Sequence, residues 1–154
     1  MLQYKRGDLF SASGQNIVFV HACNCKGSWG AGIASQFKQR FPLAYKDYQQ
    51  LCHKHDSRLL GMGVYHKRVD SSEPPVGYLF TSLNYGKTKD SKDKILKNTK
   101  RSIACLLSVL PENTQIYSPK INAGLFAVPW EETEKVILEC LKVRPDVTWT
   151  VYEL

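Results

Sequence analysis

A glycine-bearing stretch early in the sequence has the composition of an anion-binding loop. Residues 21–33 carry Gly27, Gly30 and Gly32 directly before an amphipathic stretch. Glycines let the backbone approach a ligand closely, and the start of a helix offers unpaired N–H groups to an anion. A flexible connector has the same composition, and the spacing is not that of a Walker A loop. The stretch alone therefore leaves both interpretations open.

A second stretch, residues 118–130, repeats this character later in the chain. It contains a turn sequence followed by two apolar residues, namely Asn122, Ala123, Gly124, Leu125 and Phe126. Apolar residues in a loop that enters a helix can wall a pocket whose floor is backbone N–H, although for either residue alone a place in the core is favoured. Two such loops together predict a diphosphate held from both sides.

Several side chains close to these loops and to the N-terminus have the types needed for proton transfer, nucleophilic attack or base recognition. His21 ends a predicted strand, and because imidazole titrates near neutrality it is a candidate proton donor or water-orienting base; the alternative is a buried histidine. Cys23 or Cys25 as a phosphoenzyme nucleophile is disfavoured, since no phosphate-loop pattern with a following arginine is present. Asp8 either accepts a hydrogen bond from the amino group of a base or caps a turn.

The composition indicates a cytoplasmic or nuclear, monomeric protein without a membrane anchor. The 154 residues match one domain, 1–154, and no apolar run approaches the roughly 18 residues of a membrane span. Five cysteines without the spacing of a disulfide framework indicate reduced thiols. The sequence lacks the Cys-x-x-Cys pair that would predict a metal site. The net charge of +7 is concentrated in residues 87–101, as in a solvated helix face or a surface that steers a polyanion.

Short strand-like runs alternate with helical periodicity along the chain. Strands are predicted at Leu2–Lys5, Ile17–His21, Gly63–Arg68, Val76–Ser82, Gln115–Pro119 and Val147–Tyr152, with a surface turn at Asp70–Pro75. Helical stripes run over 33–41, 44–52, 95–110 and 130–141, with Pro42 interrupting the first and Pro129 suited to the first turn of the last. This alternation predicts an α/β fold with three layers, α/β/α, around a mixed, largely parallel sheet of about six strands. Ligands of such sheets bind beyond the C-terminal strand ends.

These loops resemble the motifs of the macrodomain family. The similar segments are Lys5-Arg6-Gly7-Asp8-Leu9-Phe10 and the loops 24–33 and 122–130, in the family's order, and the resemblance extends from Tyr4 to Leu154. Within the family the chain looks like the fungal ADP-ribose-1″-phosphate phosphatases, on residues 21–30, 79–82 and 128–134.

The resemblance implies a role for each matched residue. Asp8 would hold the adenine amino group with help from the Leu9 backbone, and Tyr152 would lie near the adenine. Asn24 would hydrogen-bond the distal ribose and, with His21, take part in catalysis. The distal phosphate and ribose would be lined by Gly30, Ala31, Gly32 and Ile33. The diphosphate would be wrapped by backbone N–H groups of Asn122, Ala123, Gly124, Leu125 and Phe126, with Phe126 beside the distal ribose.

The reaction implied by this resemblance is hydrolysis of the distal-ribose phosphate, giving ADP-ribose and phosphate in the disposal of a tRNA-splicing by-product. It requires no cofactor and no metal. A related branch, the terminal ADP-ribose protein glycohydrolases, uses a lysine and an aspartate, whose positions here hold Ser82 and Phe126, so that chemistry is not expected. Two alternatives stay open: a reader of ADP-ribose or ADP-ribosylated protein (or a mono-ADP-ribosyl hydrolase), and a basic RNA-binding domain.

Overall fold

The sheet of this protein places the two glycine-bearing stretches at one edge. The computed structural model describes residues 1–67 and 72–153. Within them lie six strands: β1 (Leu2–Arg6), β2 (Ile17–Asn24), β3 (Gly63–His66), β4 (Val76–Ser82), β5 (Gln115–Ser118) and β6 (Thr148–Glu153). Their order is β1-β6-β5-β2-β4-β3, and only the β3–β4 pair among these is antiparallel. The predicted mixed, largely parallel sheet is thereby confirmed.

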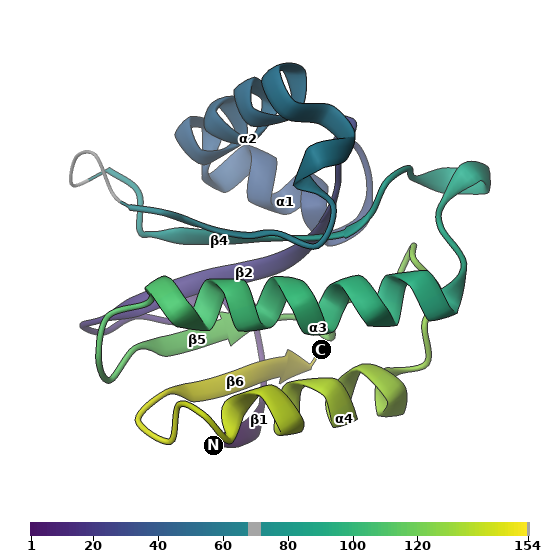
Figure 1. Cartoon of the computed structure of the whole chain (residues 1–154). Helices are drawn as coiled ribbons and strands as arrows, with labels where there is room; N and C mark the ends of the chain where they lie inside the picture. Colours follow the sequence, from purple (N-terminus) through teal and green to yellow (C-terminus); the bar gives the residue numbers. More distant parts are fainter. Residues whose placement is uncertain (68–71, 154) are drawn as a thin grey trace.

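Helices cover both faces of the sheet. They are α1 (Gly32–Arg40), α2 (Pro42–His55), α3 (Lys92–Val109) and α4 (Trp130–Leu141), with short 3-10 turns η1 (Leu9–Ser11), η2 (Asp56–Leu59) and η3 (Gly86–Thr88). In Figure 1, α1 and α2 lie on one side of the sheet and α3 and α4 on the other. This is the three-layer α/β/α arrangement that the sequence predicts.

The central strand β2 is buried on both faces because its side chains alternate between two cores. Val18 and Val20 pack into the cluster that includes α3 and α4, whereas Phe19 and Cys23 pack into an aromatic cluster beneath α1 and α2. The period of two residues along a strand therefore places His21, which is 0% exposed, on the aromatic side.

Most element boundaries lie within a few residues of the predicted ones. Pro42 does interrupt the helical stripe, and it begins α2 at a position where its missing N–H costs nothing. Strand β2 continues past His21 to Asn24, so the first loop starts later than predicted. Arg68, the predicted last residue of the strand that begins at Gly63, and part of the predicted surface turn Asp70–Pro75 lie outside the described residues. No helix within the described ranges is long and apolar enough to cross a membrane.

Candidate functional site

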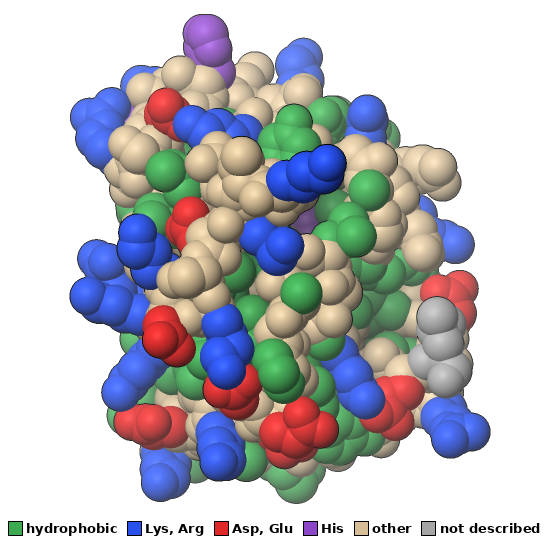
Figure 2. Space-filling model, turned by 90° about the vertical axis from the view of Figure 1, so that its right-hand side faces the viewer, with side chains coloured by type: hydrophobic (Ala, Val, Ile, Leu, Met, Phe, Trp, Pro, Cys, Tyr) green, Lys and Arg blue, Asp and Glu red, His purple; other side chains and the backbone are tan. Residues whose placement is uncertain are grey.

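Two loops leave neighbouring strands at the same edge of the sheet. Strands β2 and β5 pair in parallel, so the first glycine loop (residues 25–31) and the second glycine loop (residues 119–129) both begin at C-terminal strand ends. A Cβ built on Gly32 would lie 3.4 Å from Leu125 Cδ1, which places the second loop in contact with the start of α1. Figure 2 faces this edge and shows lysine and arginine side chains distributed around it.

Asn24 organises the first glycine loop from inside. Its Oδ1 accepts hydrogen bonds from the backbone N–H groups of Lys26 (2.9 Å) and Ser28 (3.4 Å) and from the Tyr48 hydroxyl (2.9 Å). Its Nδ2 donates to the Ser28 carbonyl at 2.8 Å. The amide therefore shapes the loop, and its expected contact with the distal ribose stays a prediction.

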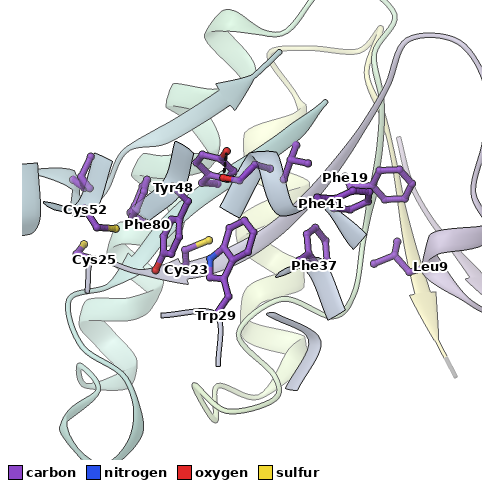
Figure 3. Close-up of a cluster of buried hydrophobic side chains, with 14 of the residues drawn as sticks. Leu9, Phe19, Cys23, Cys25, Trp29, Phe37, Phe41, Tyr48, Cys52 and Phe80 are labelled. Atoms are coloured by element: carbon purple, nitrogen blue, oxygen red, sulfur yellow. Dashed lines mark hydrogen bonds between the residues drawn. The ribbon is translucent and has the colours of Figure 1, made fainter. Parts of the chain in front are cut away.

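Trp29 anchors the same loop in the aromatic core. The indole is 1% exposed, stacks on Tyr48 with ring centroids 4.7 Å apart and meets the edge of His21 at 4.5 Å. Figure 3 shows Trp29 lying between Tyr48 and Phe37. Burial of a side chain this large makes the first glycine loop a fixed element, so the interpretation as a flexible connector does not apply.

The first glycine loop ends in backbone N–H groups that have no acceptor in the part of the chain that the structure describes. Helix α1 begins at Gly32, whose φ of 61° lies in the left-handed region that glycine tolerates. Its N-cap, Ala31, has no side chain that could accept from the first turn. The N–H groups of that turn therefore remain available to an anion. Gly30, Ala31 and Gly32 are exposed and Ile33 is half-buried, as a ligand-lining role requires.

The second glycine loop also presents backbone donors. No hydrogen bond of the described structure uses the N–H of Gly124, Leu125 or Phe126 as donor. Asn122, by contrast, is 4% exposed and its side chain points into the protein, where it bonds to Thr81 and Thr99. The backbone role expected for residues 122–126 agrees with this geometry at residues 124–126, whereas the Ala123 N–H donates to the Lys120 carbonyl at 3.2 Å and the Asn122 side chain bonds within the interior.

The expectation that His21 transfers a proton does not agree with its surroundings. The ring is 0% exposed, stacks on Phe37 at a centroid distance of 4.0 Å and lies 3.6 Å from the Cys23 sulfur. Burial lowers the pKa of His21 to about 3, so the imidazole is neutral near pH 7. The alternative interpretation, a buried histidine, fits, although its partners are rings and a thiol.

Asp8 caps a turn. Its Oδ1 accepts from the Phe10 N–H at 3.0 Å, and its Oδ2 lies 4.0 Å from the Arg40 guanidinium. The carboxylate remains exposed enough to accept from a ligand as well. Leu9 is buried, and Tyr152 is 8% exposed with its ring edge on Tyr117. These residues follow β1 and line β6, on the far side of β5 from the first glycine loop.

The cysteines have the properties of core residues. Burial raises the pKa of the Cys25 thiol to about 12 and that of Cys23 well above its ordinary value. Because the thiolate is the nucleophile, both are poorly suited to attack phosphorus. No group of three or more His, Cys, Asp or Glu residues in the described ranges is arranged to hold a metal ion.

Asp90 is a site candidate that the sequence reasoning missed. It lies in the loop that follows β4, at the same sheet edge, and its Oδ2 accepts from the Leu83 N–H at 2.9 Å. Leu83 in turn accepts from the Cys25 N–H, which joins this loop to the first glycine loop. An aspartate just before a helix start resembles a cap, and Ser91 performs that function here. Ser82 is fully buried and bonded within its own loop.

Two lysines of the basic segment 87–101 form ion pairs with acidic side chains of this protein. Lys92 pairs with Glu132 at 3.2 Å and Lys100 with Glu139 at 3.0 Å, both on α4. For these two lysines the interpretation as a solvated, ion-paired face applies. Steering of a polyanion stays a prediction for the remaining basic side chains.

Two cavities of the described structure lie away from the residues of the two loops that present backbone donors. One of about 500 Å³ adjoins Phe10 and Arg40, and one of about 390 Å³ adjoins Cys25 and Cys52. Neither is lined by residues 30–33 or 122–126. The site therefore rests on backbone donors of the two loops, with the exposed Leu125 side chain lying beside Gly32.

Comparisons with known proteins show which proteins this chain is similar to. The ADP-ribose 1″-phosphate phosphatase of Meyerozyma guilliermondii is 42% identical, covering 88% of this chain and 91% of that protein, and that of Saccharomyces cerevisiae is 32% identical, covering 99% and 98%. The solved macrodomain of Thermus aquaticus DarG superposes with a TM-score of 0.80 at 25% identity, covering 100% and 99% of the two chains. Thermosipho africanus DarTG, solved in complex with ADP-ribose, gives 0.77 at 17% identity, covering 99% of this chain and 42% of that one. The Macro domain family model matches residues 20–137, and the chain belongs to this family.

Proposed function

We propose that this protein hydrolyses ADP-ribose 1″-phosphate to ADP-ribose and inorganic phosphate. The observation that carries the proposal is the pair of touching loops at the ends of β2 and β5, both of which present backbone N–H groups without an acceptor among the described residues. Such donors suit a ligand with a diphosphate and a further phosphate. Fungal relatives that match most of the chain carry the name of this activity.

The reaction needs a positioned phosphoryl group, compensation of its charge and a proton for the leaving oxygen. Water attacks phosphorus, the bond between phosphorus and the ribose oxygen breaks, and that oxygen takes a proton. The first turn of α1 compensates charge on the transferred group, and residues 124–126 hold the diphosphate. Asp90 supplies a carboxylate at the same edge that is able to orient water. His21, buried and neutral, is not assigned a step.

Phosphate release from ADP-ribose 1″-phosphate tests the proposal. Wild type is expected to release phosphate with ADP-ribose as a competitive product inhibitor. Asn24→Ala is expected to lose most activity because the first glycine loop loses its internal amide. Asp90→Asn keeps the size of the side chain and tests the carboxylate. Tight binding of ADP-ribose without phosphate release would favour the non-catalytic reader instead.

A further inference from the structure

A buried chain of hydrogen bonds joins the second glycine loop to β4 and α3. Asn122 Oδ1 accepts from the Thr81 hydroxyl at 3.0 Å, and Asn122 Nδ2 donates to the Thr99 hydroxyl oxygen at 2.9 Å. The Thr99 hydroxyl donates its own proton to the Ile95 carbonyl at 2.6 Å. Thr81 and Thr99 are 0% exposed and Asn122 is 4% exposed.

The donor and acceptor directions of these hydrogen bonds leave the side-chain amide of Asn122 a single orientation. Because Thr99 uses its only proton on Ile95, its oxygen can only accept, which requires the NH₂ group of Asn122 to face it. The amide oxygen of Asn122 then faces Thr81, whose hydroxyl is the donor. A side chain held at both ends in this way fixes the backbone that carries it.

The backbone of Asn122 controls the loop that follows. Its φ of 64° lies in the left-handed region, and its carbonyl accepts from the Val128 N–H at 2.9 Å, which closes residues 122–128 into one turn. The direction of the N–H groups of residues 124–126 depends on the position of this turn relative to β4 and α3. Removal of the Thr99 hydroxyl leaves the buried Asn122 amide donor without its acceptor, so the turn shifts.

We propose that Thr99 and Thr81 act through Asn122 as positioning residues for the ligand, although neither is accessible to it. In its choice of ligand the proposal rests on the function proposed above. A role confined to stability would lower the unfolding temperature and leave the affinity of the folded protein unchanged. A positioning role changes affinity as well.

The test compares two threonines that are both 0% exposed. Thr99→Val is expected to weaken ADP-ribose binding about tenfold, whereas Thr133→Val is expected to leave it unchanged, because the Thr133 hydroxyl has no partner among the described residues. Asn122→Gly preserves the left-handed backbone and removes the amide. The double variant Asn122→Gly/Thr99→Val is expected to bind no more weakly than Asn122→Gly, since both changes break the same connection.

Amide hydrogen exchange supplies a readout that does not depend on the ligand. Thr99→Val is expected to speed exchange of the hydrogen-bonded amides of Ala123, Ala127 and Val128 and to leave residues 25–31 unchanged. Equal affinity and equal exchange in Thr99→Val and Thr133→Val would overturn the proposal. Failure of wild type to bind ADP-ribose would contradict the proposed function, while the exchange comparison would still decide whether Thr99 positions the loop.

Discussion

Replacing Gly32 with alanine tests whether the junction of the two glycine loops binds the ligand. Gly32 has a φ of 61°, and Gly86, in the η3 turn, has a φ of 65°. Alanine in the left-handed region costs about 1 kcal/mol of stability at either position. A Cβ on Gly86 meets no atom within 4 Å, whereas one on Gly32 would lie 3.4 Å from Leu125 Cδ1. Gly86→Ala is therefore a control matched for backbone strain.

The two variants are expected to separate in affinity. In Gly32→Ala the backbone relaxes away from the strained φ and shifts the first-turn N–H groups of α1, while the new methyl comes into van der Waals contact with Leu125. Loss of one charge-assisted hydrogen bond weakens ADP-ribose binding at least about tenfold, or about 1.4 kcal/mol. Isothermal titration calorimetry measures this, with thermal unfolding to confirm equal strain. Equal affinity in Gly32→Ala and Gly86→Ala would refute the assignment of this junction as the anion site.

Three further predictions concern the interior beneath the site. Burial places the pKa of His21 in the folded protein at about 3, below the unfolded value of about 6.5. The contribution of His21 to stability is therefore complete above pH 6.5 and is lost as the pH falls toward 3. The free energy of urea unfolding of wild type is expected to depend on pH more steeply than that of His21→Phe, by up to about 1.4 kcal/mol per pH unit. Tyr48→Phe removes the donor to Asn24 Oδ1 and to the Asn24 carbonyl, and should lower the free energy of unfolding by about 1–2 kcal/mol; an unchanged urea midpoint would contradict the role given to that hydroxyl. In the native protein, iodoacetamide should alkylate the partly exposed Cys105 well before Cys23 or Cys25, whose thiols are buried with raised pKa values; mass spectrometry of the labelled peptides shows the order.

The sequence predicts the glycine loops well because their signals are local. Gly30 and Gly32 directly precede an amphipathic stretch, and the α1 boundary follows from that adjacency. Strand alternation also carries information that the sequence interpretation of His21 did not use. In a strand buried on both faces, a residue two positions from Phe19 and two from Cys23 shares their face, which here is an aromatic core.

The internal roles of Asn24 and Asn122 could not be predicted from the sequence. Asn24 bonds to a hydroxyl 24 residues away, on Tyr48, and Asn122 bonds to one 23 residues away, on Thr99. Such partners depend on how α2 and α3 pack against the sheet, which no spacing along the chain specifies. The sequence resemblance therefore suggested a ligand contact for the Asn24 amide and a backbone contact for Asn122, and gave no sign that both amides also shape their loops.

The most direct test of the account is ³¹P NMR of ADP-ribose 1″-phosphate incubated with the wild-type protein. The account predicts that the monoester resonance disappears as inorganic phosphate appears, while the two diphosphate resonances persist at the positions of ADP-ribose. A monoester resonance that outlasts saturating enzyme, or diphosphate resonances that disappear first, would contradict it.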